Sequence, residues 1–171
     1  EPEIATVRLD PGLAFGTGTH PTTALCLEWL SENHTAFQAQ TIIDYGCGSG
    51  ILGIAGKLLG AKVCYSTDID PQAIYATEQN SERNNVVVYP ALPENFKPTK
   101  AKVVLSNILS GPLVELSPIL SNLVEPGGHL VLAGLLEHDA EYVKEAYRDQ
   151  FTFEADKSLD GWTRLHGIKN Q

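Results

Sequence analysis

IIDYGCGSGI, residues 42–51, decides the fold of this chain. Its apolar start ends in an acid, Asp44, and leads into a loop with glycine at every second position from Gly46 to Gly50. A helical pattern follows, and a second acid, Asp68, closes the next apolar run, 22 residues after Gly46. This order predicts a nucleoside-binding site at the edge of a parallel sheet, where the second acid accepts hydrogen bonds from two ribose hydroxyls.

Two cofactor classes share this arrangement. Residues 48–53, GSGILG, fit the G-x-G-x-x-G spacing of dinucleotide enzymes, which place a pyrophosphate at the helix N-terminus, but that register leaves Gly46 unexplained. The other register begins at Gly46 and resembles the first motif of Rossmann-like S-adenosylmethionine-dependent methyltransferases. Asp44 favours it, because a carboxylate suits the ammonium and sulfonium groups of S-adenosylmethionine and repels a pyrophosphate. A glycine turn without any ligand would not explain Asp68.

Composition narrows the possibilities further. A length of 171 residues and 43% hydrophobic residues fit one globular α/β domain. Twenty-one acids against 12 bases give a net charge of −9, which argues against a nucleic-acid partner and permits either a basic protein partner or a plain solvated surface. Three cysteines without metal or disulfide spacing indicate a reduced, cytoplasmic protein, and no metal site is expected. Because the chain starts at Glu1 and has no methionine, we expect residues 1–7 to be the remnant of an upstream linker and residues 8–171 to be the domain.

Strand and helix patterns alternate as in a parallel sheet with helices on both faces. Helices are predicted over residues 22–33, 51–59, 71–83, 113–123 with a break at Pro118, and 137–149. Strands are predicted over residues 41–45, 62–67, 86–89, 102–106 and, after a turn at residues 126–128, 129–135. Residues 152–156 and 162–168 then flank Asp160-Gly161, a hairpin-type turn. The predicted fold is α/β: a Rossmann-like, seven-stranded, mostly parallel sheet with a C-terminal antiparallel hairpin, whereas dehydrogenases usually stop at six parallel strands.

Two further patches carry polar groups that could serve a site. Residues 9–23, LDPGLAFGTGTHPTT, form a glycine- and threonine-rich loop with one aromatic, Phe15, able to fold over a ligand. His20 within it is more often a satisfied loop histidine than a catalyst. Asn107 lies at the carboxyl end of a strand, where ligands of such sheets bind, and its side-chain carbonyl could accept a hydrogen bond from an amine. An asparagine that caps the next helix is the alternative.

Five segments together closely resemble the PrmA-type methyltransferases, bacterial enzymes that modify the eleventh protein of the large ribosomal subunit. They are LDPGLAFGTGTHPTT, IDYGCGSGILGIA, DIDPQAI, SNILSGPLVELSP and the PGG before strand 129–135. The resemblance spans about residues 7–169. It implies an S-adenosylmethionine-dependent protein methyltransferase that N-methylates lysine and N-terminal amines of a basic ribosomal protein. It also implies that the family's N-terminal substrate-recognition domain is absent here. The net charge and the lack of a long apolar run lead us to expect neither a nucleic acid nor a membrane as a direct partner.

Carried over position by position, the family's cofactor contacts fall on four residues: Thr23, Gly46, Asp68 and Asn107. Asn107 is also the expected catalytic residue, since it could orient a neutral amine for transfer. Five neighbours complete the candidate cofactor-binding set: Asp44, Gly48, Ile69, Phe15 and Thr19.

Departures from the family's pattern are modest. Gly53 and Gly56 stand where the family usually has alanine, and each costs its helix up to about 1 kcal/mol unless it permits closer packing. Ser106 also replaces a usual alanine. Two other functions stay open: a small-molecule amine or catechol methyltransferase on the same fold, and a non-catalytic cofactor-binding domain. The first should lack both the threonine-rich loop and the Asn-Ile-Leu patch at residues 107–109, and the second should have lost Asp68 or Asn107.

Overall fold

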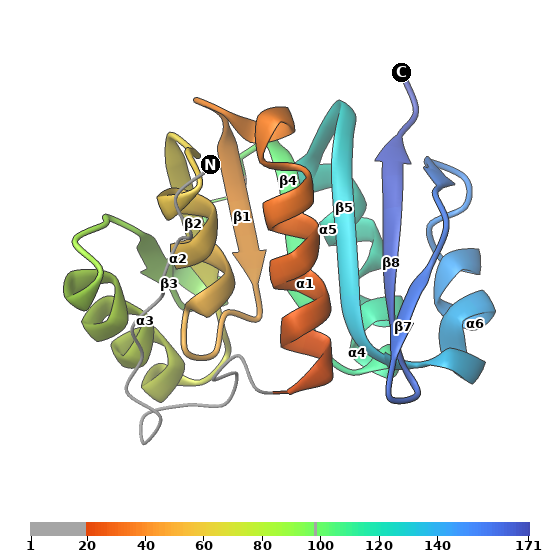
Figure 1. Cartoon of the computed structure of the whole chain (residues 1–171), viewed down its shortest axis with the longest axis horizontal. Coiled ribbons are helices and arrows are strands. Elements are labelled where there is room, and N and C mark those ends of the chain that lie inside the picture. The colour runs from red at the N-terminus through yellow and green to blue at the C-terminus, as the bar shows by residue number, and fades with distance from the viewer. Residues whose placement is uncertain (1–19, 98) are drawn as a thin grey trace.

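A single eight-stranded sheet with helices on both faces forms the framework of the protein (Figure 1). The structure, a computed structural model, describes residues 20–97 and 99–171. Neighbouring strands follow the order β3-β2-β1-β4-β5-β8-β6, with β7 paired to β8. The strands are β1 (Thr41–Tyr45), β2 (Val63–Thr67), β3 (Tyr89–Ala91), β4 (Ala101–Asn107), β5 (Val124–Leu136), β6 (Phe151–Phe153), β7 (Lys157–Leu159) and β8 (Trp162–Lys169).

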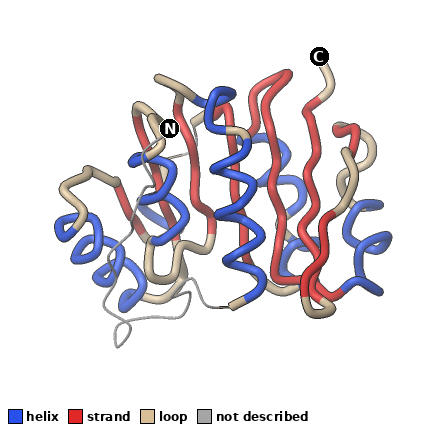
Figure 2. The backbone as a smooth tube through the Cα atoms, viewed as in Figure 1, coloured by secondary structure: helices blue, strands red, loops and turns tan. Residues whose placement is uncertain are grey.

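Six α-helices are found among the described residues, and Figure 2 shows how they alternate with the strands. They are α1 (Pro21–Glu32), α2 (Ile51–Leu58), α3 (Pro71–Arg83), α4 (Ser110–Glu115), α5 (Ser117–Leu123) and α6 (Ala140–Glu145). Short 3₁₀ turns cover His34–Phe37, Pro93–Asn95 and Glu137–Asp139. None of the described helices is long and apolar enough to cross a membrane.

The predicted mixture of parallel and antiparallel strands is confirmed. Strands β3, β2, β1, β4 and β5 pair in parallel, and β8 runs antiparallel to β5, β6 and β7. The short strand β7 adds an eighth strand to the seven expected. The hairpin between β7 and β8 turns at Asp160 and Gly161, which both have positive φ (52° and 83°), as a two-residue type I′ turn requires.

Four predicted boundaries were wrong. The strand predicted over 152–156 is β6 and ends at Phe153, so the strand that flanks the turn at Asp160 is β7 instead. The N–H of Val86 bonds the carbonyl of Ser81 at the end of α3, so the third strand begins three residues late, at Tyr89. Residues 126–128 lie inside β5 rather than in a turn before it, because β5 already pairs with β4 at Val124. The predicted helix over 137–149 is reduced to a 3₁₀ turn and α6, after which 3₁₀-type bonds such as Tyr147 N–H to the Lys144 carbonyl end it.

The apolar core is divided by the sheet into two layers. One lies under α1 and α2 and includes Trp29, Ile42 and Ile54, and the other lies under α4, α5 and α6. Gly56 lets α2 approach the sheet, since a Cβ there would stand 2.2 Å from Cδ1 of Ile42. A Cβ on Gly53 would stand 2.7 Å from Sγ of Cys64. The packing condition that would offset the helix-propensity cost of both glycines is therefore met.

Candidate functional site

The glycine loop between β1 and α2 is shaped by left-handed backbone. Gly46, Gly48 and Gly50 have φ of 89°, 53° and 86°, a region that side-chain-bearing residues seldom adopt. The N–H groups of Gly46 and Cys47 both donate to the carbonyl of Thr67 at the end of β2, at 2.8 and 3.0 Å. A Cβ on Gly46 would lie 2.6 Å from Cγ2 of Ile108, so the backbone must be bare at this point.

Helix α3 holds the same loop from the side. Oγ1 of Thr77 donates to the carbonyl of Gly48 at 3.2 Å, and Nδ2 of Asn80 donates to the carbonyl of Ser49 at 2.9 Å. Both side chains are completely buried. Spacing of three residues puts them on one face of α3, so consecutive loop carbonyls are held by consecutive turns of the helix. We call Thr77 and Asn80 the loop clamp.

Asp68 follows β2 and faces the loop. Its Oδ2 accepts a hydrogen bond from the N–H of Gly48 at 3.0 Å, and its Oδ1 accepts one from the N–H of Asp70, also at 3.0 Å. The carboxylate is thus fixed in orientation by backbone donors, and each oxygen keeps a lone pair for a further donor. Ile69, the next residue, is 85% exposed, which leaves an apolar side chain uncovered beside this carboxylate.

Asp44 lies behind the loop with its side chain 1% exposed. Its Oδ2 accepts a hydrogen bond from the N–H of Gly53 in the first turn of α2, at 3.2 Å. Burial raises the pKa of Asp44 to about 7; the Gly53 hydrogen bond opposes this rise and the nearby Asp68 charge adds to it. Asp44 therefore takes up a proton close to neutral pH.

Asn107, the last residue of β4, lies next to the first turn of α1. Its Nδ2 donates to Oγ1 of Thr23 at 3.4 Å, which leaves its side-chain carbonyl unused by this contact. The amide makes no capping bond to α4, whose N-cap is Leu109, so the structure does not support a helix-cap role. His20 is the N-cap of α1: its Nδ1 lies 2.9 Å from Oγ1 of Thr22, and it accepts from the Thr22 N–H.

The carboxyl ends of β1, β2 and β4 bring the sequence-predicted residues to one edge of the sheet, at the bottom of Figure 1. Gly48 contacts Asp68 there and Gly46 contacts the adjacent Thr67, while Asn107 at the end of β4 contacts Thr23 of α1. Phe15 and Thr19 lie outside the described residues. Sequence reasoning missed the loop clamp, because threonine and asparagine on a helix carry no signal by themselves. It also missed Trp162, whose ring lies 5.1 Å from that of His20.

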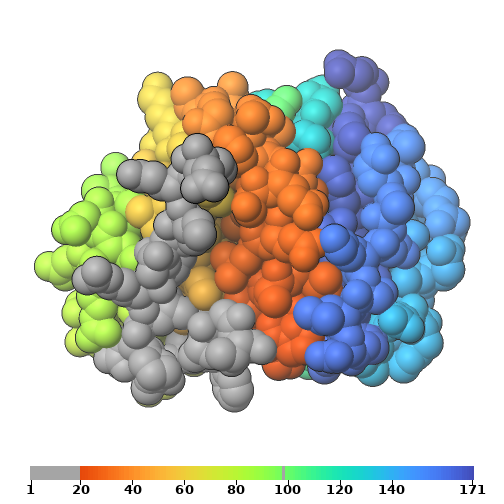
Figure 3. Space-filling view, in the orientation of Figure 1, coloured from red at the N-terminus to blue at the C-terminus, as the bar shows by residue number. Residues whose placement is uncertain are grey.

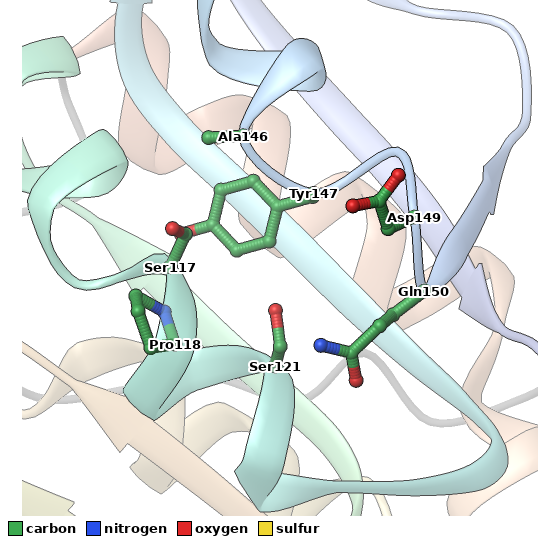
Figure 4. A pocket seen from close by; sticks show the side chains of 7 residues that line it. All are labelled: Ser117, Pro118, Ser121, Ala146, Tyr147, Asp149 and Gln150. Atoms are coloured by element: carbon green, nitrogen blue, oxygen red, sulfur yellow. The ribbon is translucent and has the colours of Figure 1, made fainter.

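A separate small pocket of about 160 Å³ lies between α5 and the chain after α6 (Figure 4). The ring of Tyr147 forms its centre, with the hydroxyl bonded to the carbonyl of Leu113, and the side chains of Ser121 and Asp149 lie around it. None of its lining residues belongs to the glycine loop, to Asp68 or to Asn107. Among the described residues, no group of three His, Cys, Asp or Glu side chains could hold a metal ion.

Comparison with known proteins gives a family for this arrangement. Residues 1–170 match the family described as "Ribosomal protein L11 methyltransferase (PrmA)". The ribosomal protein L11 methyltransferase of Marinomonas sp. (strain MWYL1) is 50% identical over 173 residues, which cover 99% of this chain and 58% of that protein. The chain therefore spans somewhat more than half the length of such relatives.

Solved structures agree in fold. The ribosomal protein L11 methylase of Lactobacillus delbrueckii subsp. bulgaricus superposes with a TM-score of 0.84 at 29% identity, covering 96% of this chain and 86% of that one. An RNA methyltransferase of Salinibacter ruber, solved in complex with S-adenosyl-L-homocysteine, superposes with a TM-score of 0.70 at 18% identity, covering 89% of this chain and 95% of that one. The second likeness concerns the fold alone.

Proposed function

This chain belongs to the ribosomal protein L11 methyltransferase (PrmA) family, and from that premise we propose that it transfers methyl groups from S-adenosylmethionine to lysine and N-terminal amines of ribosomal protein L11. The observation that carries the proposal is that two groups of candidate residues lie at the same edge of the sheet. The loop with Asp68 suits a nucleoside, and Asn107 beside Thr23 presents an uncharged amide one strand away. We also propose a cytoplasmic location, where the ribosomal protein is made.

The described residues fit S-adenosylmethionine. Asp68 offers free lone pairs for ribose hydroxyls, and the exposed Ile69 offers an apolar surface for the adenine ring. Gly46 leaves bare backbone at the turn. Oγ1 of Thr67, in the residue before Asp68, is buried and has no hydrogen-bond partner among the described residues, so a polar group of a ligand or a water could be accommodated there. Gly46, Asp68, Ile69, Thr23 and Asn107 are the residues that would hold the cofactor.

The chain's own residues have to bind the cofactor, orient the substrate amine and keep water away from both. S-adenosylmethionine, when bound, supplies a methyl group activated on a sulfonium. A lysine ammonium, with an unperturbed pKa of about 10.4, has no lone pair and loses its proton before transfer. Asn107 accepts a hydrogen bond from the neutral amine and aligns it, which raises the rate by orientation. Bulk water can accept the proton; His20 uses its Nδ1 to cap α1, and its other ring nitrogen could relay a proton.

A calorimetric titration of Asp68→Ala with S-adenosylmethionine tests this proposal. Loss of a hydrogen-bonded charged group should weaken binding by about 1.5–3 kcal/mol, or roughly 10- to 150-fold. Asp149→Ala, at an exposed acid away from the loop, is the matched control and should bind like the wild type. Titration with NAD separates the two cofactor classes. Unchanged affinity in Asp68→Ala, or tighter binding of NAD than of S-adenosylmethionine, would remove the proposed cofactor site.

A small-molecule amine methyltransferase is the second candidate, supported by the fold. Methylation assays with ribosomal protein L11 and with small amines at equal concentration decide between them.

A further inference from the structure

Three apolar side chains form a row across neighbouring strands close to Asn107. Leu136 of β5 lies opposite Trp162 of β8, and Trp162 lies opposite Leu159 of β7. Directly opposed residues in antiparallel strands point to the same face of the sheet. The row is nevertheless open to solvent, since Leu136 is 37% and Leu159 is 43% exposed. We call Leu136, Trp162 and Leu159 the edge row.

The edge row lies on the face of the sheet that α1 covers, just where α1 begins. The ring of Trp162 packs edge-on against His20, the N-cap of α1, with centroids 5.1 Å apart. Lys157 at the other end of β7 forms ion pairs with Glu28 and Glu32 of α1, which fix the hairpin alongside the helix. Figure 3 shows the hairpin, in blue, beside the lower end of α1, in red-orange.

These contacts connect the edge row to the proposed site. One side of the first turn of α1 reaches Asn107 through Thr23, and its N-cap reaches Trp162 through His20. The loop and Asp68 take up the β1–β2 side of the same sheet edge. We take the substrate amine to approach Asn107 from the remaining side of this edge, that of β5 and β8. Leu109, two residues after Asn107, is a further apolar side chain and is 66% exposed.

Two exposed carboxylates border the edge row. Glu137 and Asp160 are exposed on either side of it, and the N–H of Glu137 bonds the carbonyl of Gly161, which ties the two segments together. Lys157 is neutralised by its acidic partners on α1. Lysine-rich segments combine an aliphatic stem with a cationic end, so they match apolar side chains bordered by carboxylates.

We propose that the edge row docks the residues that flank the target lysine in a basic segment of the protein substrate. This inference rests on the proposed function, because it takes the substrate to be a lysine-bearing protein. The leucine side chains of the row contact the aliphatic stems of the lysines in the segment, while Glu137 and Asp160 form ion pairs with their ammonium groups. The small size of the row makes this contact weak and transient, as a substrate that must leave requires.

Binding of fluorescently labelled ribosomal protein L11, followed by anisotropy, tests the docking independently of turnover. Leu136→Thr combined with Leu159→Thr should raise the Kd about tenfold, and threonine keeps the strand propensity. Asp160→Asn should raise it about threefold and reduce its salt dependence; asparagine tolerates the left-handed turn. The Kd for S-adenosylmethionine should stay unchanged in each variant, and melting temperatures verify folding.

Matched controls come from the region of α3 and β3, at the far border of the sheet from the edge row. Val87→Thr changes another apolar side chain, 59% exposed, and Glu82→Gln removes another exposed acid. Both should bind ribosomal protein L11 as the wild type does. Edge-row variants that bind no worse than these controls, or a wild-type chain that shows no binding at all, would overturn the docking proposal. Failure of the proposed function appears elsewhere, as lost S-adenosylmethionine binding or absent methyl transfer by a chain that still binds the ribosomal protein.

Discussion

Asn107 presents an uncharged amide at the end of β4, in contact with Thr23 and with its carbonyl left over. A carboxylate in this position would stabilise an ammonium, which cannot accept a methyl group. An amide carbonyl instead accepts a hydrogen bond from a neutral amine without holding its proton in place. Under the proposed function, an asparagine in this position would therefore favour the neutral form of the substrate amine.

Substitution of Asn107 should separate turnover from cofactor binding. Asn107→Ala should lower kcat for methyl transfer by roughly 10- to 100-fold while the Kd for S-adenosylmethionine changes less, because the lost interaction acts mainly in the transition state. Asn107→Asp should move the pH–rate profile to higher pH. Steady-state rates measured across pH with the amine substrate check both. Wild-type turnover in the two variants would make Asn107 a structural residue only.

Helix α3 shapes the glycine loop as a whole element, and it can do so without contacting the ligand. Thr77 and Asn80 hold the carbonyls of Gly48 and Ser49, so the loop is fixed before any ligand arrives. Thr77→Val should therefore weaken S-adenosylmethionine binding about three- to tenfold. Thr77→Ser keeps the hydroxyl and should bind S-adenosylmethionine as the wild type does. Calorimetric Kd values are the measurement.

Ser81 supplies the control for this experiment. Its hydroxyl is also buried in α3, but it donates to the carbonyl of Thr77 in its own helix. Ser81→Ala should cost stability of the fold and leave the Kd unchanged. Equal effects of Thr77→Val and Ser81→Ala on the melting temperature, with no difference in Kd, would reduce the loop clamp to ordinary helix packing.

Elements with strong local signals were predictable from the sequence. Asp70-Pro71 marks an N-cap and first turn, and α3 indeed begins at Pro71 with the Asp70 side chain capping it. The glycine loop and its two acids were found because their spacing is dictated by backbone conformation. Strand β3 was misplaced because its start depends on pairing with β2, a tertiary contact that the apolar residues 86–88 do not reveal. The edge row was missed for the same reason: its three residues become neighbours only through strand register.

Two buried groups make opposing contributions to the pH dependence of stability. The pKa of Asp44 is raised by burial to about 7, so the folded state keeps a proton that the unfolded state loses, and stability falls as pH rises from about 4 to 7. The pKa of His166 is lowered to about 4 by burial, then by His129 and Arg164, so stability falls as pH drops from about 6.5 to 4. The two dependences oppose each other in one window.

Single substitutions should separate the two opposing pH dependences of the free energy of unfolding. Asp44→Asn should make the free energy of unfolding rise with pH between about 4 and 7, and His166→Gln should make it fall, each by on the order of 1–3 kcal/mol. Urea denaturation at several pH values measures these slopes, and the wild type should show the shallowest one. Slopes identical in all three proteins would show that neither group titrates as its burial implies.

Strand β3 has a consequence for how molecules of this protein meet in concentrated solution. It forms one border of the sheet, is three residues long and carries Pro90 at its centre. Proline has no N–H, so an incoming strand finds no donor there, and a border of three residues gives it little to align with. The opposite border is formed by β6 and β7, which are equally short. Both borders thus discourage the strand-by-strand growth that leads to aggregation.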